Sequence, residues 1–256
     1  MDLILKEGER VDEINDRVKL IQRENGLTFG TDAYLLSCFC RPTKNARAAD
    51  LGCGTGVISL LLAARERYQK IYAVEAQDAF AALAARNVEL NGFSHTVSVL
   101  NRDVRDLSPA DFGGELDVIF SNPPYMRADS GFSCTHAEKQ IARHEVLGDL
   151  GDFTAAAARC LRYGGALYLV YRPDRLETMF AALRAAKFAP KRMLFVQDAP
   201  EKAPSMVLCE ARLGGNEGLS VLPTLILRES AQEHTLSYLR RYFKHYFAFL
   251  YTDKFP

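Results

Sequence analysis

The residues with the clearest chemical meaning form one short segment near the middle of the chain. An apolar run at 116–120 is followed directly by Ser121, Asn122, Pro123, Pro124 and Tyr125. The side-chain oxygen of Asn122 and the carbonyl of Pro123 can each accept one N–H of a planar amine, which stabilises the positive charge formed on alkylation. Proline has no N–H and a fixed φ, so these acceptors are held in place, and Tyr125 offers a face for base stacking. We therefore predict amino-group methylation with residues 122–125 as the catalytic set; the alternative is a stiff turn that only ends a strand.

A glycine-rich turn earlier in the chain predicts where the second reactant binds. Asp50 lies near the end of an apolar run and precedes Gly52, Cys53, Gly54 and Gly56. The glycines permit a sharp turn and let a ligand approach the backbone. Their G-x-G-x-G spacing differs from the G-x-G-x-x-G dinucleotide fingerprint, and an acid before the loop would repel a phosphate and attract a cationic amine. This favours S-adenosylmethionine, which carries ammonium and sulfonium charges, over NAD.

Two further carboxylates follow the next predicted strands. Glu75 ends the run at 71–75, where it can accept from both ribose hydroxyls, and Asp103 follows 96–100, where it can accept from the adenine amino group. Either alone would read as an ordinary capping or solvated acid, but three acids at successive strand ends on one rim favour a cofactor site. The predicted cofactor-binding residues are Thr31, Asp32, Asp50, Gly52, Cys53, Gly54, Gly56, Glu75, Ala76, Asp103, Val104 and Asn122.

The elements that must position these residues show two alternating periodicities. Strand-like apolar runs occur at 46–51, 71–75, 96–100, 116–121 and 166–171, and helical patterns at 57–68, 77–91 and 153–161. The alternation predicts an α/β, Rossmann-like fold with a seven-stranded, mostly parallel sheet and helices on both faces. A helix at 174–186 and extended runs at 192–197 and 205–213 predict an antiparallel edge hairpin.

The N-terminal part predicts a smaller unit ahead of this sheet. Runs at 17–22 and 27–29 flank Asn25-Gly26, which favours a tight hairpin, and Thr31 is the predicted N-cap of a helix at 33–39. Because no repeat or flexible linker divides the chain, we expect a single domain over 1–256. Within it, 1–45 would hold the hairpin and capping helix, 46–213 the catalytic core and 214–256 a C-terminal extension.

Composition sets wider bounds. The 256 residues include 32 basic and 32 acidic side chains, so a nucleic-acid site would have to come from local clustering. The six cysteines show no C-x-x-C spacing, so we expect reduced thiols, no metal site and a cytoplasmic protein. The N-terminus is charged too early for a signal peptide, and no run of ~18 apolar residues offers a membrane span.

These motifs resemble those of class I S-adenosylmethionine-dependent methyltransferases, and the NPPY segment resembles the members that methylate amino groups. More narrowly, the segments 30–33, 141–145, 171–173 and 190–192 are similar to the bacterial tRNA1(Val) adenosine N6-methyltransferase family. The resemblance implies a class I methyltransferase fold and methyl transfer from S-adenosylmethionine to the exocyclic N6 amine of an unpaired adenosine. It implies a tRNA substrate modified at the adenosine 3′ of the anticodon. We expect no membrane association and no obligate protein partner.

An adenine inside a duplex cannot reach such a pocket, whereas an anticodon loop offers unpaired bases. Basic side chains that could contact RNA form three groups, namely Lys139 and Arg143; Arg184, Lys187, Lys191 and Arg192; and Arg240, Arg241 and Lys244. The last group interleaves with aromatic residues, which suits phosphate contact and base stacking. The same aromatic residues follow helical spacing, so the segment is equally well interpreted as a terminal helix that packs on the domain.

Other functions fit the same catalytic segment. Protein-glutamine N5-methyltransferases that act on release factors use NPPY because a carboxamide nitrogen is equally planar, but they carry a helical domain ahead of the fold. Guanine-N2 methylation of rRNA is usually accompanied by a different aromatic residue after Pro-Pro. A cofactor-binding scaffold without turnover would have no need of Asn122.

Overall fold

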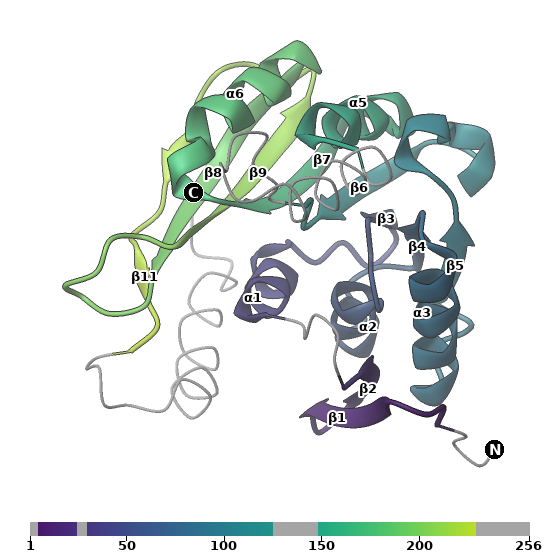
Figure 1. The fold of residues 1–256 in the computed structure, drawn as a ribbon. Coiled ribbons are helices and arrows are strands. Elements are labelled where there is room, and N and C mark those ends of the chain that lie inside the picture. Colours follow the sequence, from purple (N-terminus) through teal and green to yellow (C-terminus); the bar gives the residue numbers. More distant parts are fainter. Residues whose placement is uncertain (1–4, 25–29, 125–147, 229–256) are drawn as a thin grey trace, which may run out of the picture.

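The computed structural model describes residues 5–24, 30–124 and 148–228, and its centre is a nine-stranded sheet (Figure 1). The strand order is β10-β8-β9-β7-β6-β3-β4-β5, and β11 also pairs with β8. The strands are β3 (Arg47–Leu51), β4 (Lys70–Glu75), β5 (Val97–Asn101), β6 (Leu116–Ser121), β7 (Leu161–Tyr171), β8 (Phe188–Gln197), β9 (Met206–Leu213), β10 (Ser220–Val221) and β11 (Leu225–Ile226).

Helices cover both faces of this sheet. Figure 1 shows α1 (Thr31–Phe39), α2 (Val57–Ala64) and α3 (Asp78–Leu90) on one side and α5 (Leu150–Cys160) and α6 (Leu176–Ala185) on the other. Short 3-10 helices are η1 (Val104–Asp106), η2 (Pro109–Phe112) and η3 (Pro173–Arg175). None of the helices in the described ranges has the length and apolar character to cross a membrane.

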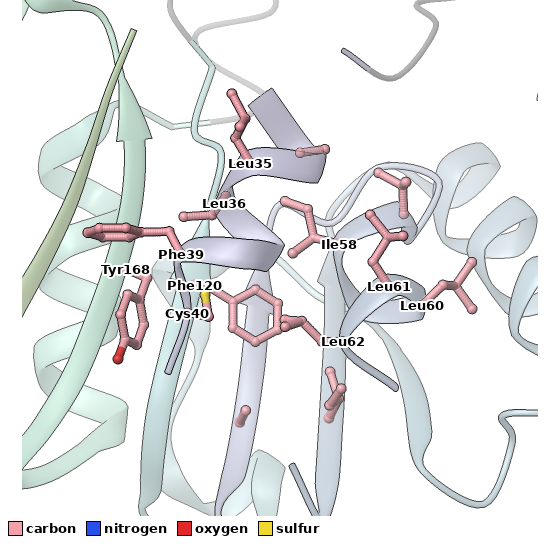
Figure 2. Packing of buried hydrophobic residues seen from close by; sticks show 14 of the residues in the cluster. Leu35, Leu36, Phe39, Cys40, Ile58, Leu60, Leu61, Leu62, Phe120 and Tyr168 are labelled. Carbon is pink, nitrogen blue, oxygen red and sulfur yellow. The ribbon is translucent and has the colours of Figure 1, made fainter. Parts of the chain in front are cut away.

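Two hydrophobic clusters hold the layers together, one on each face. Successive residues of a strand point to opposite faces, so Phe120 of β6 joins the first cluster and Ile119 the second. Figure 2 shows Phe120 and Tyr168 beneath the apolar side chains of α1 and α2. Because both faces are covered, the parallel strands are near-continuous apolar runs, and this is why the sequence revealed them.

The predicted fold class is confirmed, with two differences in the sheet. The predicted seven strands correspond to β3 to β9, but β10 and β11 raise the count to nine. The β8–β9 hairpin is antiparallel as predicted, and β9 lies between β7 and β8. Since β10 and β11 pair with β8, the hairpin is not the outer edge. Both added strands have two residues, too few to show a periodicity.

The structure contains an N-terminal hairpin upstream of the predicted one. β2 (Val18–Arg23) pairs with the upstream strand β1 (Glu9–Asn15), and the Arg17 N–H donates to the Asn15 side chain at 2.9 Å in the turn. The predicted turn and partner, residues 25–29, lie outside the described residues. β1 escaped prediction because its charged sequence shows no strong apolar alternation.

Candidate active site

A cavity of about 390 Å³ lies at the carboxyl ends of β3, β4 and β6. The predicted site residues that line it are Asp32, Gly52, Cys53, Gly54, Glu75, Ala76, Val104, Asn122 and Pro124. They come from five separate stretches of the chain, so the parallel sheet has brought strand ends to one rim as expected. Burial raises the pKa of the Cys53 thiol well above its ordinary value, which keeps this group neutral.

The glycine turn has the backbone that only glycine adopts easily. Gly52 has φ +72°, and a Cβ there would lie 3.0 Å from the ring of Phe153. Gly54 has φ +55° with no other group within 4 Å of its Cβ position, so a ligand can approach the chain at this point. The turn therefore forms a close-fitting floor for the cavity.

Glu75 joins this turn to the end of β4. Its carboxylate accepts from the Gly54 N–H and from the Gln77 N–H, both at 2.9 Å, and the residue is only 4% exposed. The Gln77 side-chain Nε2 also donates to Glu75 Oε1, at 3.4 Å. A carboxylate has about four acceptor positions, so these three bonds leave capacity for a ribose hydroxyl. The position of Glu75 in the cavity wall fits the predicted contact.

Asp50 does not line the cavity. The residue is fully buried, its Oδ2 accepts from the Ser59 hydroxyl at 2.8 Å, and its Oδ1 has no hydrogen-bond partner among the described residues. Burial raises the pKa of Asp50 to about 7. In this structure its Oδ2 faces Ser59 of α2, and its predicted contact with a cationic ligand amine stays a prediction.

Three further predicted residues of this rim, Asp103, Thr31 and Gly56, do not line the first cavity. The Asp103 carboxylate is bound by the Arg105 guanidinium and backbone N–H and lies outside the cavity wall; its hydrogen bond with Arg105 lowers its pKa. Thr31 is not the N-cap of α1, because Gly30 takes that position and no side chain caps the helix. Gly56 also lies outside the wall, at the N-cap of α2 with φ +85°. Each of these residues lies in a turn or at the start of a helix. The position of a residue after a strand does not by itself reveal this.

Asn122 follows β6 on the cavity wall. The preceding residue, Ser121, is buried and donates its hydroxyl to the Leu51 carbonyl at 2.7 Å, which ties β6 to β3. The Asn122 side-chain Nδ2 donates to Asp32 Oδ2 at 2.7 Å. Pro124 lines the cavity and Pro123 is buried beside it, while Tyr125 lies outside the described residues.

Aromatic residues of the cavity were missed by the sequence reading. Phe80 and Phe153 line it from the first turns of α3 and α5. Both lie in predicted helical segments, where an apolar residue gives no sign that it faces a ligand. Their positions in the sequence could have revealed them. A helix that follows a strand begins at this edge of the sheet, so side chains in its first turn lie near the rim.

A second cavity, of about 670 Å³, adjoins the first. It is lined by Thr31 of α1, by Tyr171 at the end of β7, by Arg172 and Pro173 after it, and by Pro204 to Met206 before and at the start of β9. Gly30 and Asp32 line both cavities, so Asp32 stands between them.

The predicted RNA-binding group at 184–192 is not brought to this rim. β8 runs parallel to β7, because both are antiparallel to β9, so it begins at the opposite edge of the sheet from Asn122. Arg184 and Lys187 line a separate cavity there, and the Lys191 amine contacts the Asn216 carbonyl.

Arg192 is a wrong prediction for RNA contact. Its side chain is 12% exposed, forms an ion pair with buried Glu210 at 2.8 Å and lies over the Phe39 ring at 4.5 Å. The sequence does not show whether a basic residue in a strand is exposed. Here the ion pair with Glu210 holds the Arg192 side chain in the interior. The remaining predicted RNA-binding residues, Lys139, Arg143, Arg240, Arg241 and Lys244, lie outside the described residues.

Comparison with known proteins decides the family. The family model for the methyltransferase small domain matches residues 24–187, which include every residue lining the first cavity. The chain belongs to this family. A relative from Tolumonas auensis named tRNA1(Val) (adenine(37)-N6)-methyltransferase is 31% identical over 180 residues, covering 70% of this chain and 73% of the relative.

Two further comparisons extend the similarity beyond the core. A relative of the same name from Shigella dysenteriae is 27% identical over 234 residues and covers 85% of this chain and 93% of its own. The solved structure of a predicted O-methyltransferase from Agrobacterium tumefaciens has a TM-score of 0.63 and 25% identity, covering 79% and 90% of the two chains.

The cavity of this methyltransferase fits S-adenosylmethionine, the cofactor that family membership indicates. Asp32 and Glu75 line it, ionisable Asp50 lies beneath it, and no Lys or Arg is among the described lining residues. An acidic wall without a basic partner suits a ligand with two positive charges and opposes a phosphate. The unpartnered Oδ1 of Asp50 is a buried acceptor whose ionised form such a ligand would favour.

Proposed function

We propose that the protein transfers a methyl group from S-adenosylmethionine to the exocyclic N6 amine of an unpaired adenosine in tRNA, the adenosine 3′ of the anticodon. The observation that carries this is the position of Asn122 and Pro124 on the wall of the acidic cavity, at the end of β6. The name shared by the Tolumonas and Shigella relatives supports tRNA and adenine over glutamine or guanine.

The chain's own groups account for the handling of the amine. When bound, S-adenosylmethionine supplies an electrophilic methyl group. Asn122 Oδ1 and the Pro123 carbonyl oxygen accept hydrogen bonds from the two N–H groups of the adenosine amine. The lone pair of its nitrogen is therefore directed toward the cofactor cavity. The proton released after methyl transfer passes to water, so no strong general base is needed. The aromatic walls Phe80 and Phe153 exclude water from one side of the cavity.

The second cavity supports an entry route for the target nucleotide. It adjoins Asn122 through Asp32, and it brings together segments 30–33 and 171–173 from distant parts of the chain. Tyr171 and Pro173 offer apolar contact, and Arg172, which is 47% exposed and paired with Asp174, offers a positive charge to the backbone of the RNA. Further contacts by Lys139, Arg143, Arg240, Arg241 and Lys244 remain predictions.

Nucleoside mass spectrometry tests this function. tRNA from cells that lack the protein should have less N6-methyladenosine, and the purified protein should restore it in vitro. Asn122→Ala should abolish transfer and change cofactor affinity by no more than a fewfold, whereas Asn216→Ala, an exposed asparagine at the opposite edge of the sheet, should leave both unchanged. Normal tRNA accompanied by lost methylglutamine in release factors, or lost N2-methylguanosine in rRNA, would refute the proposal.

A further inference from the structure

Asp32 and Asn122 form a pair that the sequence reading did not predict. They are 90 positions apart, in α1 and after β6, and the Asn122 Nδ2 donates to Asp32 Oδ2 at 2.7 Å. The other carboxylate oxygen, Oδ1, accepts from the Ala33 backbone N–H at 2.9 Å. Both oxygens of Asp32 therefore have defined partners within the protein, one in its own helix and one in the catalytic segment.

The fold is shaped to keep the carboxylate in this position. A Cβ on Gly30 would lie 2.5 Å from Asp32 Oδ1, so a larger residue at position 30 would displace the carboxylate from this position. The φ of Gly30 is −96°, which any residue adopts, so backbone strain does not explain the glycine. Figure 2 shows the next turns of α1 packed into the core, where Leu35, Leu36 and Phe39 are fully buried. Asp32 is thus held by a fixed helix.

We propose that Asp32 is a positioning residue that decides which end of the Asn122 amide faces the target amine; this rests on the proposed function. An ionised carboxylate only accepts hydrogen bonds, so Asn122 can meet Asp32 only through Nδ2. The acceptor end, Oδ1, is then the end directed away from Asp32. A flipped amide would present N–H donors to the N–H donors of the substrate, and methyl transfer from that arrangement fails.

The charge of Asp32 adds a second effect on the same atoms. A negative group hydrogen-bonded to Nδ2 polarises the amide and increases the negative charge on Oδ1. It also favours the positive charge that develops on the substrate nitrogen. This assigns Asp32 a role through Asn122, in addition to its place on the acidic wall of the cofactor cavity.

Single-turnover kinetics at saturating cofactor and tRNA separate the two roles. Asp32→Ala should lower the methyl-transfer rate at saturating cofactor about 10- to 100-fold, the range for losing a charge-assisted hydrogen bond, and this loss should exceed any loss of cofactor affinity. Asp78→Ala is the matched control, because it removes an exposed first-turn acid from α3 without touching the cavity. A tenfold or greater loss of cofactor affinity with an unchanged saturated rate would make Asp32 a cofactor ligand and overturn the proposal.

Exchange of the two side chains gives a rescue test. Asn122→Asp alone should be inactive, because it faces two carboxylates toward each other. The double variant Asp32→Asn/Asn122→Asp restores one donor, one acceptor and the same net charge, so it should exceed Asn122→Asp by about tenfold or more. Circular dichroism would establish that each variant is folded. A double variant no faster than Asn122→Asp would overturn the proposal.

An NMR measurement without any substrate separates this proposal from the assigned function. The Asn122 side-chain NH2 signals, identified by their loss in Asn122→Ser, should shift in Asp32→Ala and stay in place in Asp78→Ala. If the signals shift but the wild-type protein methylates no tRNA, the pair exists and the proposed substrate is wrong. If Asp32→Ala leaves the signals unchanged, the pair does not form and the positioning role fails even if tRNA is methylated.

Discussion

Replacing Asp50 by asparagine should change how the stability of the protein depends on pH. Burial, opposed by the Ser59 hydrogen bond, raises the pKa of Asp50 from 3.8 to about 7. Each pKa unit corresponds to about 1.4 kcal/mol, so ionising this carboxyl costs the fold about 4 kcal/mol more than ionising it in the unfolded chain.

The sign follows from the order in which the two states lose the proton. Below about pH 4, Asp50 is protonated in both states and the cost is absent. Between about pH 4 and pH 7 the unfolded chain loses the proton first, so the free energy of unfolding falls as pH rises. Above pH 7 the native protein carries the full cost.

Asp50→Asn removes this titration and can still accept from the Ser59 hydroxyl. Its free energy of unfolding relative to wild type should rise by about 4 kcal/mol between about pH 4 and pH 8, measured by urea denaturation followed by circular dichroism. Any constant penalty from the new amide cancels in this difference. Parallel curves for the two proteins would refute the reasoning.

Asp117→Asn is the control with the opposite sign. Burial raises the pKa of Asp117, but the Arg47 backbone N–H and the Arg162 guanidinium outweigh it and hold the pKa below its ordinary value. Ionised Asp117 therefore stabilises the fold at pH values above its ordinary pKa, and this stabilisation is lost as pH falls. The free energy of unfolding of Asp117→Asn relative to wild type should therefore decrease as pH rises.

The same carboxyl should couple cofactor binding to pH. A cationic ligand above the turn favours ionised Asp50, so wild-type affinity for S-adenosylmethionine should increase as pH rises through about 7. Asp50→Asn should bind more weakly at pH 8 and show a flatter profile by calorimetry. Equal pH profiles would show that the charge of Asp50 does not reach the ligand.

Three further predictions concern the turn, the hairpin and the RNA surface. Gly52→Ala should weaken S-adenosylmethionine binding at least tenfold by calorimetry, because φ is +72° and the new Cβ meets the Phe153 ring; unchanged affinity would contradict the close-fitting turn. Asn87→Ala should cost about 2–4 kcal/mol in urea unfolding, since its buried amide bonds Ile21 in β2 and the Thr55 carbonyl of the cofactor turn; a loss below about 0.5 kcal/mol would contradict this. Neutralising Arg240, Arg241 and Lys244 together should weaken tRNA binding and flatten its salt dependence in filter binding, whereas unchanged binding would favour a purely structural segment.

The central strands and their chemical ends were predictable because their signals are local. β3, β4 and β6 are apolar runs that end at a glycine turn, at Glu75 and at Asn122. A parallel strand covered on both faces can be recognised from such a run alone. β1, the upstream strand of the N-terminal hairpin, was not predicted because it is stabilised by contacts far along the chain. Arg86 of α3 binds Glu9 at 2.6 Å, and Asn91 bonds the Lys19 backbone.

The site divides in the same way. The sequence by itself determined that Gly52, Glu75 and Asn122 meet at one edge of a parallel sheet, because strand direction and loop chemistry are local properties. Only the tertiary structure decided that Asp50 is buried beneath the turn and that Asp32 meets Asn122 across 90 residues. The physical reason is that burial and hydrogen-bond partners depend on which distant surfaces pack together, and a polar side chain has the same sequence signature whether it faces water, a ligand or another side chain.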